Sequence, residues 1–364
     1  MTSEERRQGR YLRRKQKRMK FLDKQPSYDE VFTWKNMMIC SHKSTLKVGW
    51  KASTQTHKLF ELRNVAKLME ELKDRKYKLR PFAKFYIKER GKVRFIQSCH
   101  IRDRIVQKCF VDFFLMDVIR PKLIYDNGAC LKGKGVSFTR KRLKRHLDYI
   151  KKTEGGFDDK YIVIMDIKSF FDSICHSFVI QMVNNAVKDG ELLTMYSMLV
   201  SAFDGEAGLG LGSQISQISA TFYLNRFDHF VKDKLAIKCY SRYMDDSYFI
   251  INDKQEAHTY VDEIDKICSA LKLKLNRRKT SVIKLGHGFT FLKRKYCFSK
   301  TVYVTASPEI VIRQRRKIKS MSKSERFTKP FVLQSLNSWK SCLLKTSSFK
   351  RYQNMELLVN KLWR

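Results

Sequence analysis

The stretch Tyr243-Met244-Asp245-Asp246 places two adjacent carboxylates between an aromatic segment, Cys239-Tyr240-Ser241, and an apolar segment, Tyr248-Phe249-Ile250-Ile251. This pattern predicts a strand, a tight turn and a second strand, with the acid pair at the tip. Adjacent carboxylates raise each other's proton affinity unless a cation lies between them, and a divalent metal is the usual reason to build such a pair. Taken alone, the pair is equally consistent with a polar hairpin turn.

A third carboxylate follows another apolar run. Tyr161-Ile162-Val163-Ile164-Met165 is continuously apolar, as is typical of a strand buried on both faces, and it ends in Asp166. Asp166 alone could equally cap a following helix. Together with Asp245 and Asp246 it gives three carboxylates at the ends of two predicted strands, a set that suits two-metal phosphoryl transfer.

The charge of the chain indicates its partner. The 364 residues carry a net charge of +39, with 75 basic and 36 acidic residues, so we expect nucleic acid as the partner. No apolar run approaches the roughly 20 residues of a membrane-spanning helix, and the basic N-terminus lacks the apolar core of a secretory signal. The nine cysteines form no C-x-x-C pair, which argues against structural zinc. We therefore expect a cytoplasmic protein with free thiols and no membrane partner.

Periodicity and composition predict several further elements. Residues 1–25 are dominated by Arg and Lys, and form either a solvated tail or a basic arm for a nucleic-acid backbone. Residues 58–78 and 102–118 have helical spacing, and glycine-rich residues 205–212 precede another helical segment. Two short strands flanking Glu89-Arg90-Gly91 predict a hairpin. One face would present Lys84, Lys88, Lys92 and Arg94, although the turn decides which of these align.

The order of these motifs carries a resemblance. After the strand that ends in Asp166 come the glycine-rich turn with its helix and the Y-x-D-D hairpin. The basic turn Leu275-Asn276-Arg277-Arg278-Lys279-Thr280 and the short strand Phe289-Thr290-Phe291-Leu292 follow. This series, which spans roughly residues 80 to 300, resembles the reverse transcriptases.

The resemblance implies an α+β right-hand polymerase with fingers, a palm of antiparallel sheet plus helices, and a small helical thumb. The implied boundaries are a basic N-terminal region at 1–55, fingers at 56–155, a palm at 156–305 with part of the fingers between 177 and 205, and a thumb at 306–364.

The resemblance also implies an RNA-directed DNA polymerase. Its partners would be an RNA template, a DNA or RNA primer and deoxynucleotide triphosphates. The implied catalytic residues are Asp166, Asp245 and Asp246. These carboxylates and the carbonyl of Ile167 would hold two Mg²⁺ ions, for which Mn²⁺ can substitute.

Four residues match positions that handle the incoming nucleotide in this family. Arg94, with Lys92 beside it, matches the finger residue that grips the triphosphate. Phe171 matches a steric gate against the ribose 2′ hydroxyl; the alternative is a core aromatic. Lys279 matches the basic residue near the leaving pyrophosphate; the alternative is an ordinary solvated lysine.

The glycine-rich motif indicates a subgroup. Where retroviral and group II intron enzymes carry Pro-Gln-Gly, this chain has Gly210-Leu211-Gly212, followed by Ser216-Gln217. Leu211, Gly212 and Gln217 would therefore lie at the nucleotide. This pattern resembles diversity-generating retroelements, as do Glu89-Arg90-Gly91-Lys92-Val93-Arg94, Asp103-Arg104-Ile105-Val106-Gln107 and Ala129-Cys130-Leu131-Lys132-Gly133-Lys134-Gly135.

This subgroup implies error-prone copying, especially opposite template adenines, and a small accessory protein oligomer as a further partner. Two alternatives stay open. One is an antiphage-defence reverse transcriptase, which shares the polymerase core. The other is a nucleic-acid-binding protein with a decayed polymerase core, against which the presence of all three carboxylates argues.

Overall fold

The computed structural model describes residues 2–89, 91–153, 155–299 and 301–363. Its antiparallel sheets and helices confirm the expected α+β class. The chain divides into two units, which we describe separately. Unit 1 comprises Met1–Gly133, Ile167–Lys234 and Ile264–Lys274, and unit 2 comprises Lys134–Asp166, Leu235–Glu263 and Leu275–Arg364.

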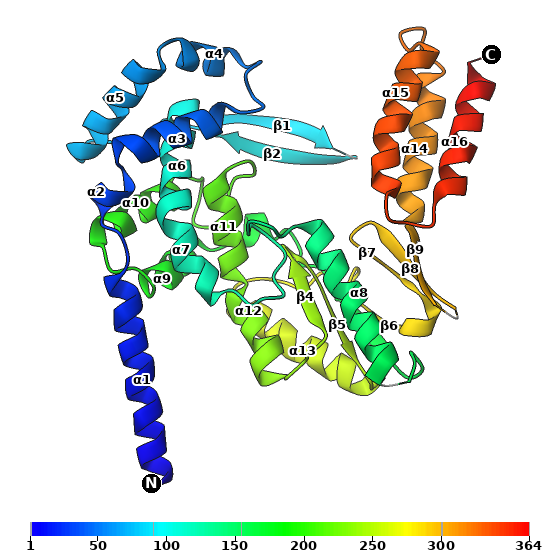
Figure 1. Cartoon of the computed structure of the whole chain (residues 1–364), viewed down its shortest axis with the longest axis horizontal. Coiled ribbons are helices and arrows are strands. Elements are labelled where there is room, and N and C mark those ends of the chain that lie inside the picture. Colours follow the sequence, from blue (N-terminus) through cyan, green and yellow to red (C-terminus); the bar gives the residue numbers. More distant parts are fainter. Residues whose placement is uncertain (1, 90, 154, 300, 364) are drawn as a thin grey trace. The chain divides into compact units, whose positions relative to one another are not determined.

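Unit 1 is mostly helical (Figure 1). Its helices are α1 (Ser3–Asp23), α2 (Tyr28–Val31), α3 (Trp34–Thr45), α4 (Ala52–Leu59), α5 (Glu61–Lys73), α6 (Ile101–Phe110), α7 (Met116–Ile119), α9 (His176–Asn184), α10 (Gly190–Ser201), α11 (Gln214–Tyr223) and α12 (Asn225–His229). The helix expected over 58–78 is shorter than predicted, because the backbone of Phe60 (φ −122°, ψ 36°) separates α4 from α5. The helix expected over 102–118 is present with a π-helical turn at Val111–Leu115.

A β-hairpin of β1 (Ala83–Glu89) and β2 (Lys92–Ser98) belongs to unit 1, as predicted. Arg90, in its turn, lies outside the described residues. The expectation of one basic face is wrong, because Lys88 pairs with Val93 whereas Glu89 pairs with Lys92. Directly paired residues share a face and neighbours alternate. Lys84 and Lys88 therefore lie on one face, and the other carries Lys92 and Arg94.

Unit 2 is built on a four-stranded antiparallel sheet in the order β4-β5-β3-β6. The strands are β3 (Tyr161–Met165), β4 (Tyr240–Tyr243), β5 (Asp246–Ile251) and β6 (Ser281–Lys284). Apolar β3 is central, between β5 and β6, which explains why its sequence does not alternate. The helix α13 (Lys254–Ala270) begins in unit 2 and ends in unit 1.

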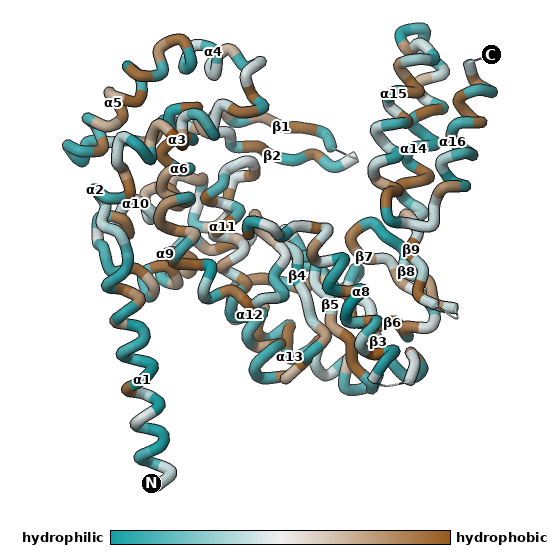
Figure 2. The backbone as a smooth tube through the Cα atoms, viewed as in Figure 1, coloured by the Kyte–Doolittle hydropathy of each residue, from teal (hydrophilic) through white to brown (hydrophobic). Residues whose placement is uncertain are grey.

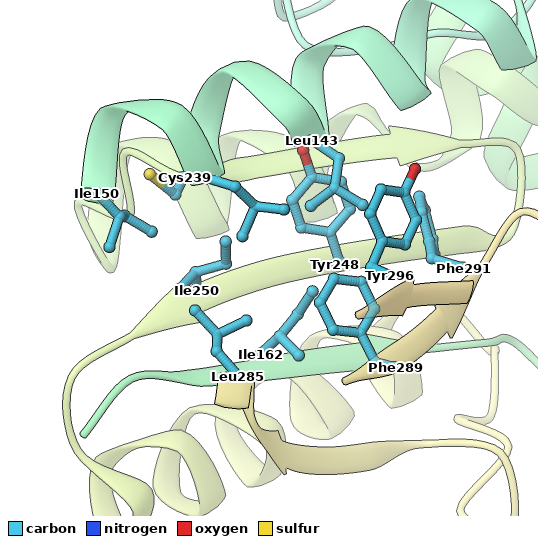
Figure 3. Close-up of a cluster of buried hydrophobic side chains, with 11 residues drawn as sticks. Leu143, Ile150, Ile162, Cys239, Tyr248, Ile250, Leu285, Phe289, Phe291 and Tyr296 are labelled. Atoms are coloured by element: carbon cyan, nitrogen blue, oxygen red, sulfur yellow. The ribbon is translucent and has the colours of Figure 1, made fainter. Parts of the chain in front are cut away.

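A second sheet of three strands continues unit 2: β7 (Phe289–Phe291), β8 (Arg294–Phe298) and β9 (Val302–Ala306). Side chains from β7 and β8 pack with those of β3, β5 and the helix α8 (Val136–Thr153) in one apolar core (Figure 3). Burial of this core stabilises the sheet that carries the candidate site. Its buried members are Leu143, Leu147, Ile150, Ile162, Cys239, Tyr248, Ile250, Leu285, Phe289, Phe291 and Tyr296.

Three C-terminal helices complete unit 2: α14 (Pro308–Met321), α15 (Lys329–Lys340) and α16 (Phe349–Leu362). They bury a core of their own that includes Ile318, Leu336 and Val359. In unit 1, α1 buries no residue and is mostly hydrophilic along its length (Figure 2). No helix among the described residues is both long and apolar enough to cross a membrane.

Candidate active site

Three carboxylates meet at one edge of the four-stranded sheet of unit 2. Asp166 directly follows β3, Asp245 lies in the β4–β5 turn, and Asp246 is the first residue of β5. Because Met165 pairs with Ser247, the end of β3 lies beside the start of β5. The antiparallel register therefore brings together acids that are about eighty positions apart in sequence.

A buried arginine donates a hydrogen bond to the turn that carries the acid pair. Met244 has a left-handed backbone (φ +55°), which is unusual for a residue with a side chain. Arg242 is fully buried, and its Nη1 donates to the Met244 carbonyl at 2.9 Å. We infer that Arg242 positions the turn. The sequence analysis missed this residue; its only signal was an arginine at a strand position beside the acid pair.

Asp166 is contacted by side chains of the basic turn at 275–280. Lys279 Nζ lies 3.0 and 2.9 Å from its two carboxylate oxygens, and Asn276 Nδ2 donates to Oδ2 at 2.7 Å. The Asn276 backbone N–H also donates to the Asp166 carbonyl at 2.8 Å. The basic turn predicted at 275–280 thus supplies both a cation and an amide to this carboxylate.

Burial, together with repulsion between the carboxylates, raises the pKa values of two acids in the cluster. Burial first, and then repulsion from Asp245 and Asp166, raises the pKa of Asp246 from 3.8 to about 7. Burial is also the largest cause that raises the pKa of Asp245. The hydrogen bond to Asp166 is the main reason that the pKa of Lys279 is raised. Such a group of acids is stabilised by a bound cation.

The donor set of the cluster fits a divalent metal of the Mg²⁺ type, which prefers carboxylate and carbonyl oxygens. As the side chains lie, however, no group of three or more His, Cys, Asp or Glu among the described residues is arranged to hold a metal ion. Lys279 neutralises Asp166 instead. Ile167, whose carbonyl is a predicted ligand, directly follows Asp166 and belongs to unit 1.

Unit 1 brings several predicted nucleotide-binding residues close together. The Leu209 N–H donates to the Phe171 carbonyl at 2.9 Å, and Leu211 forms a parallel β-bridge with Ile96 of β2. The glycine-rich segment therefore connects the Phe171 region to the hairpin. Phe171 is partly exposed, whereas its neighbour Phe170 is buried.

Two glycines shape this segment. A Cβ on Gly210 would lie 2.7 Å from the Phe203 ring and 2.9 Å from Gln97 Cβ, so the segment packs too closely for a side chain there. Gly212 has a left-handed backbone (φ +102°), which favours glycine. Next to it, the Ser213 hydroxyl donates to Gln107 Oε1 at 2.8 Å. This close packing fixes where Leu211 lies.

The other predicted nucleotide contacts are more exposed. Arg94 lies on the same hairpin face as Lys92, and its Nε is 3.3 Å from Glu89. Gln217 has an exposed side chain on α11, and its carbonyl accepts from Cys130 Sγ at 3.4 Å. Both residues belong to unit 1, whereas Lys279 lies on Asp166 in unit 2.

Comparison with known proteins matches the part of the chain that carries these motifs to one protein family. The family model described as reverse transcriptase (RNA-dependent DNA polymerase) matches residues 86–319, which is more than half of the chain. Protein YkfC of Escherichia coli (strain K12) is 23% identical over 291 residues, covering 65% of this chain and 72% of that protein.

Two solved telomerase structures align with part of this chain. The telomerase from Candida albicans, in complex with a fragment of telomeric RNA, has a TM-score of 0.49 at 12% identity, covering 66% of this chain. The apo telomerase from Candida tropicalis has a TM-score of 0.45 at 12% identity, covering 60% of this chain. This chain spans about half the length of each, 51% and 47%.

Proposed function

The chain belongs to the reverse transcriptase family of RNA-dependent DNA polymerases, and from that premise we propose that it adds deoxynucleotides to a primer 3′ hydroxyl at its three clustered carboxylates, with RNA as template. The observation that carries this proposal is the meeting of Asp166, Asp245 and Asp246 at one sheet edge. The raised pKa values of Asp245 and Asp246, and the contact of Lys279 with Asp166, suit a site that handles both cations and phosphate.

Asp166, Asp245, Asp246 and the Ile167 carbonyl are the proposed ligands of Mg²⁺, for which Mn²⁺ can substitute. When bound, two such ions activate the attacking hydroxyl and neutralise the leaving pyrophosphate. Lys279 holds Asp166 in place before substrate binds. Its ammonium group then pairs with the phosphate oxygens as negative charge develops on them.

The residues of unit 1 are proposed to select the substrate. Arg94, with Lys92, binds the triphosphate; a guanidinium is well suited to phosphate oxygens. The partly exposed ring of Phe171 excludes a ribose 2′ hydroxyl. Gly212 and Gln217 border the nucleotide, and Leu211 contacts it without a hydrogen bond.

The fingers, palm and thumb follow the same proposal. The helices and hairpin of unit 1 supply most of the fingers. The four-stranded sheet of unit 2 belongs to the palm. The helices α14 to α16, which have their own core, form the thumb.

The biological role that we propose is error-prone cDNA synthesis for a diversity-generating retroelement, with a small accessory protein oligomer as partner. Leu211 supports it, because an aliphatic side chain replaces the polar group of the Pro-Gln-Gly enzymes. An antiphage-defence enzyme is the second candidate, since it uses the same core. Neighbouring genes discriminate: a template repeat, a variable repeat and a small accessory gene favour the retroelement.

The proposed chemistry is tested by primer extension on an RNA template. We expect Asp245→Asn to abolish extension and to leave RNA binding intact, because the substitution removes a charge from the metal site. Extension at the unsubstituted rate would contradict the assignment. Absence of extension by the unsubstituted chain, with RNA still bound, would favour a decayed polymerase core.

A further inference from the structure

Unit 2 contains a basic pocket that lies outside the carboxylate site. This open pocket of about 520 Å³ is lined by residues of α8, of the strands β8 and β9, and of the segment 345–347. Its lining includes five cations and no Asp or Glu among the described residues. The residues that define the basic pocket are Arg140, Lys141, Lys144, Arg294, Tyr303 and Lys345.

The two arginines that line the pocket are held without a neutralising acid among the described residues. Arg140 Nε and Nη2 donate to the Leu292 carbonyl at 3.2 and 2.5 Å. Arg294 donates to the Leu344 carbonyl at 2.8 Å and to the Lys345 carbonyl at 3.3 Å. Among the described residues neither arginine forms an ion pair, and the buried Nε of Arg294 has no hydrogen-bond partner.

These arginines repel each other. Burial is the largest cause that lowers the pKa of Arg140, and the charge of Arg294 is the next. Two like charges that are held by neutral carbonyls in the lining of a pocket favour the binding of an anion. One wall of the pocket is held by a backbone hydrogen bond, in which the Ser347 N–H donates to the Val304 carbonyl of β9 at 2.8 Å.

The arrangement of the remaining groups favours a polymer over a single small anion. Arg140, Lys141 and Lys144 follow one another along α8, and residues three and four apart lie on one side of a helix. Lys141 and Lys144 are exposed at the rim. The ring of Tyr303, 43% exposed, lies among these cations. Cations in a row beside an exposed aromatic ring are the features that bind a nucleic-acid strand.

We infer that the basic pocket binds the phosphodiester backbone of a nucleic-acid strand, with Arg140 and Arg294 contacting one phosphate and the lysines its neighbours. This inference rests on the proposed function only in that the chain binds nucleic acid. The pocket is connected to the acid cluster by one turn. Arg140 holds the carbonyl of Leu292, and the next residue, Lys293, lowers the pKa of Asp246 by its charge.

Lysine footprinting on the full chain tests the inference. The chain is acetylated with and without a saturating RNA template–DNA primer duplex that carries a single-stranded RNA overhang, in EDTA so that no synthesis occurs. Mass spectrometry then gives the modification rate of each lysine. We expect the duplex to protect Lys141, Lys144 and Lys345 several-fold, and to leave Lys151 and Lys152, at the far end of α8, unprotected.

Additional probes identify the strand. Separate single-stranded RNA and DNA show which one fills the pocket, and protection by either supports the inference. Protection by inorganic pyrophosphate but by no nucleic acid would overturn it, as would saturating duplex binding that leaves all three pocket lysines unprotected. Primer extension by the same preparation tests catalysis independently, so that failure of the pocket and failure of the polymerase give different results.

A pair of charge-matched variants gives a second measurement. Lys141→Ala/Lys144→Ala and Lys151→Ala/Lys152→Ala each remove two positive charges from α8. We expect only the first pair to reduce the slope of log affinity against log salt, by about 1.5, because each lost phosphate contact accounts for about 0.7 to 0.9. Equal slopes for the two double variants would contradict the inference.

Discussion

Lys279 and Asp166 form an ion pair in the candidate site, with the ammonium group in contact with both carboxylate oxygens. A residue that neutralises Asp166 in this way competes with a metal ion for the same oxygens. It also lies where phosphate charge would need a cation. One side chain is therefore expected to affect metal affinity and catalysis in opposite directions.

Lys279→Ala tests this dual role. We expect the variant to bind Mn²⁺ more tightly than the unsubstituted chain without nucleotide, measured by electron paramagnetic resonance. Single-nucleotide incorporation should fall roughly 100-fold, as expected when a cation that stabilises developing charge is lost. Arg278→Ala removes the same charge from the same turn and should change neither quantity appreciably. Weaker Mn²⁺ binding by Lys279→Ala would contradict the pairing.

A second prediction at the scale of single residues concerns Leu211. Leu211→Gln adds a polar group that can hydrogen-bond the incoming nucleotide, and one such bond contributes about 1 kcal/mol, or about fivefold in discrimination. We expect fewer misincorporations opposite template adenines in sequenced cDNA. Leu211→Met, which keeps the position apolar, should copy as the unsubstituted chain does. An unchanged error spectrum for Leu211→Gln would count against the proposed role.

Sequence reasoning predicted the clustering of Asp166, Asp245 and Asp246 because each acid lies at or beside the end of a strand with a strong apolar or aromatic signal, a local pattern that is visible along the chain. It could not predict that Arg242 positions the turn, because this inference depends on the complete burial of Arg242 and its hydrogen bond to the Met244 carbonyl. It predicted that Lys279 lies near the leaving pyrophosphate but did not predict its contact with Asp166, because that contact joins residues 113 positions apart.

At the scale of elements, the glycine-rich segment depends on close packing. The Cβ that Gly210→Ala introduces would overlap Phe203 and Gln97. We expect it to lower the free energy of unfolding by about 1 to 3 kcal/mol, the usual cost of overpacking, measured by denaturant titration. Gly190→Ala, at a position in unit 1 with no atom within 4 Å of the added Cβ, should lower it little. Similar losses for the two variants would show that Gly210 is not constrained as described.

The strands that could be predicted are those with strong local signals: the apolar run of β3, the acid-tipped β4–β5 hairpin, the β1–β2 hairpin with its glycine turn, and β7 within the predicted strand 289–292. The strands β8 and β9 were not predicted. Arg294–Phe298 is half polar, and pairing with β7 and β9 holds it in place. The register of β1 and β2, and therefore the division of their lysines between two faces, also depends on pairing.

At the scale of the whole molecule, the net charge of +39 is visible in two features of the structure. One is α1, a hydrophilic helix without buried residues in unit 1. The other is the basic pocket of unit 2. Composition predicted a polyanionic partner, but only the folded chain shows which cations gather in a cavity without a neutralising acid.

The central claim is that Asp166, Asp245 and Asp246 act together in RNA-templated DNA synthesis. The most direct test is the rate of single-nucleotide incorporation on an RNA template with Mg²⁺, with duplex affinity measured in parallel. The panel comprises each Asp→Asn variant and, as a control, Asp253→Asn, an exposed carboxylate that accepts from the Glu256 N–H at the start of α13. We predict that all three site variants lose incorporation while keeping duplex affinity, and that Asp253→Asn retains both. Undiminished incorporation by any of the three would contradict the claim.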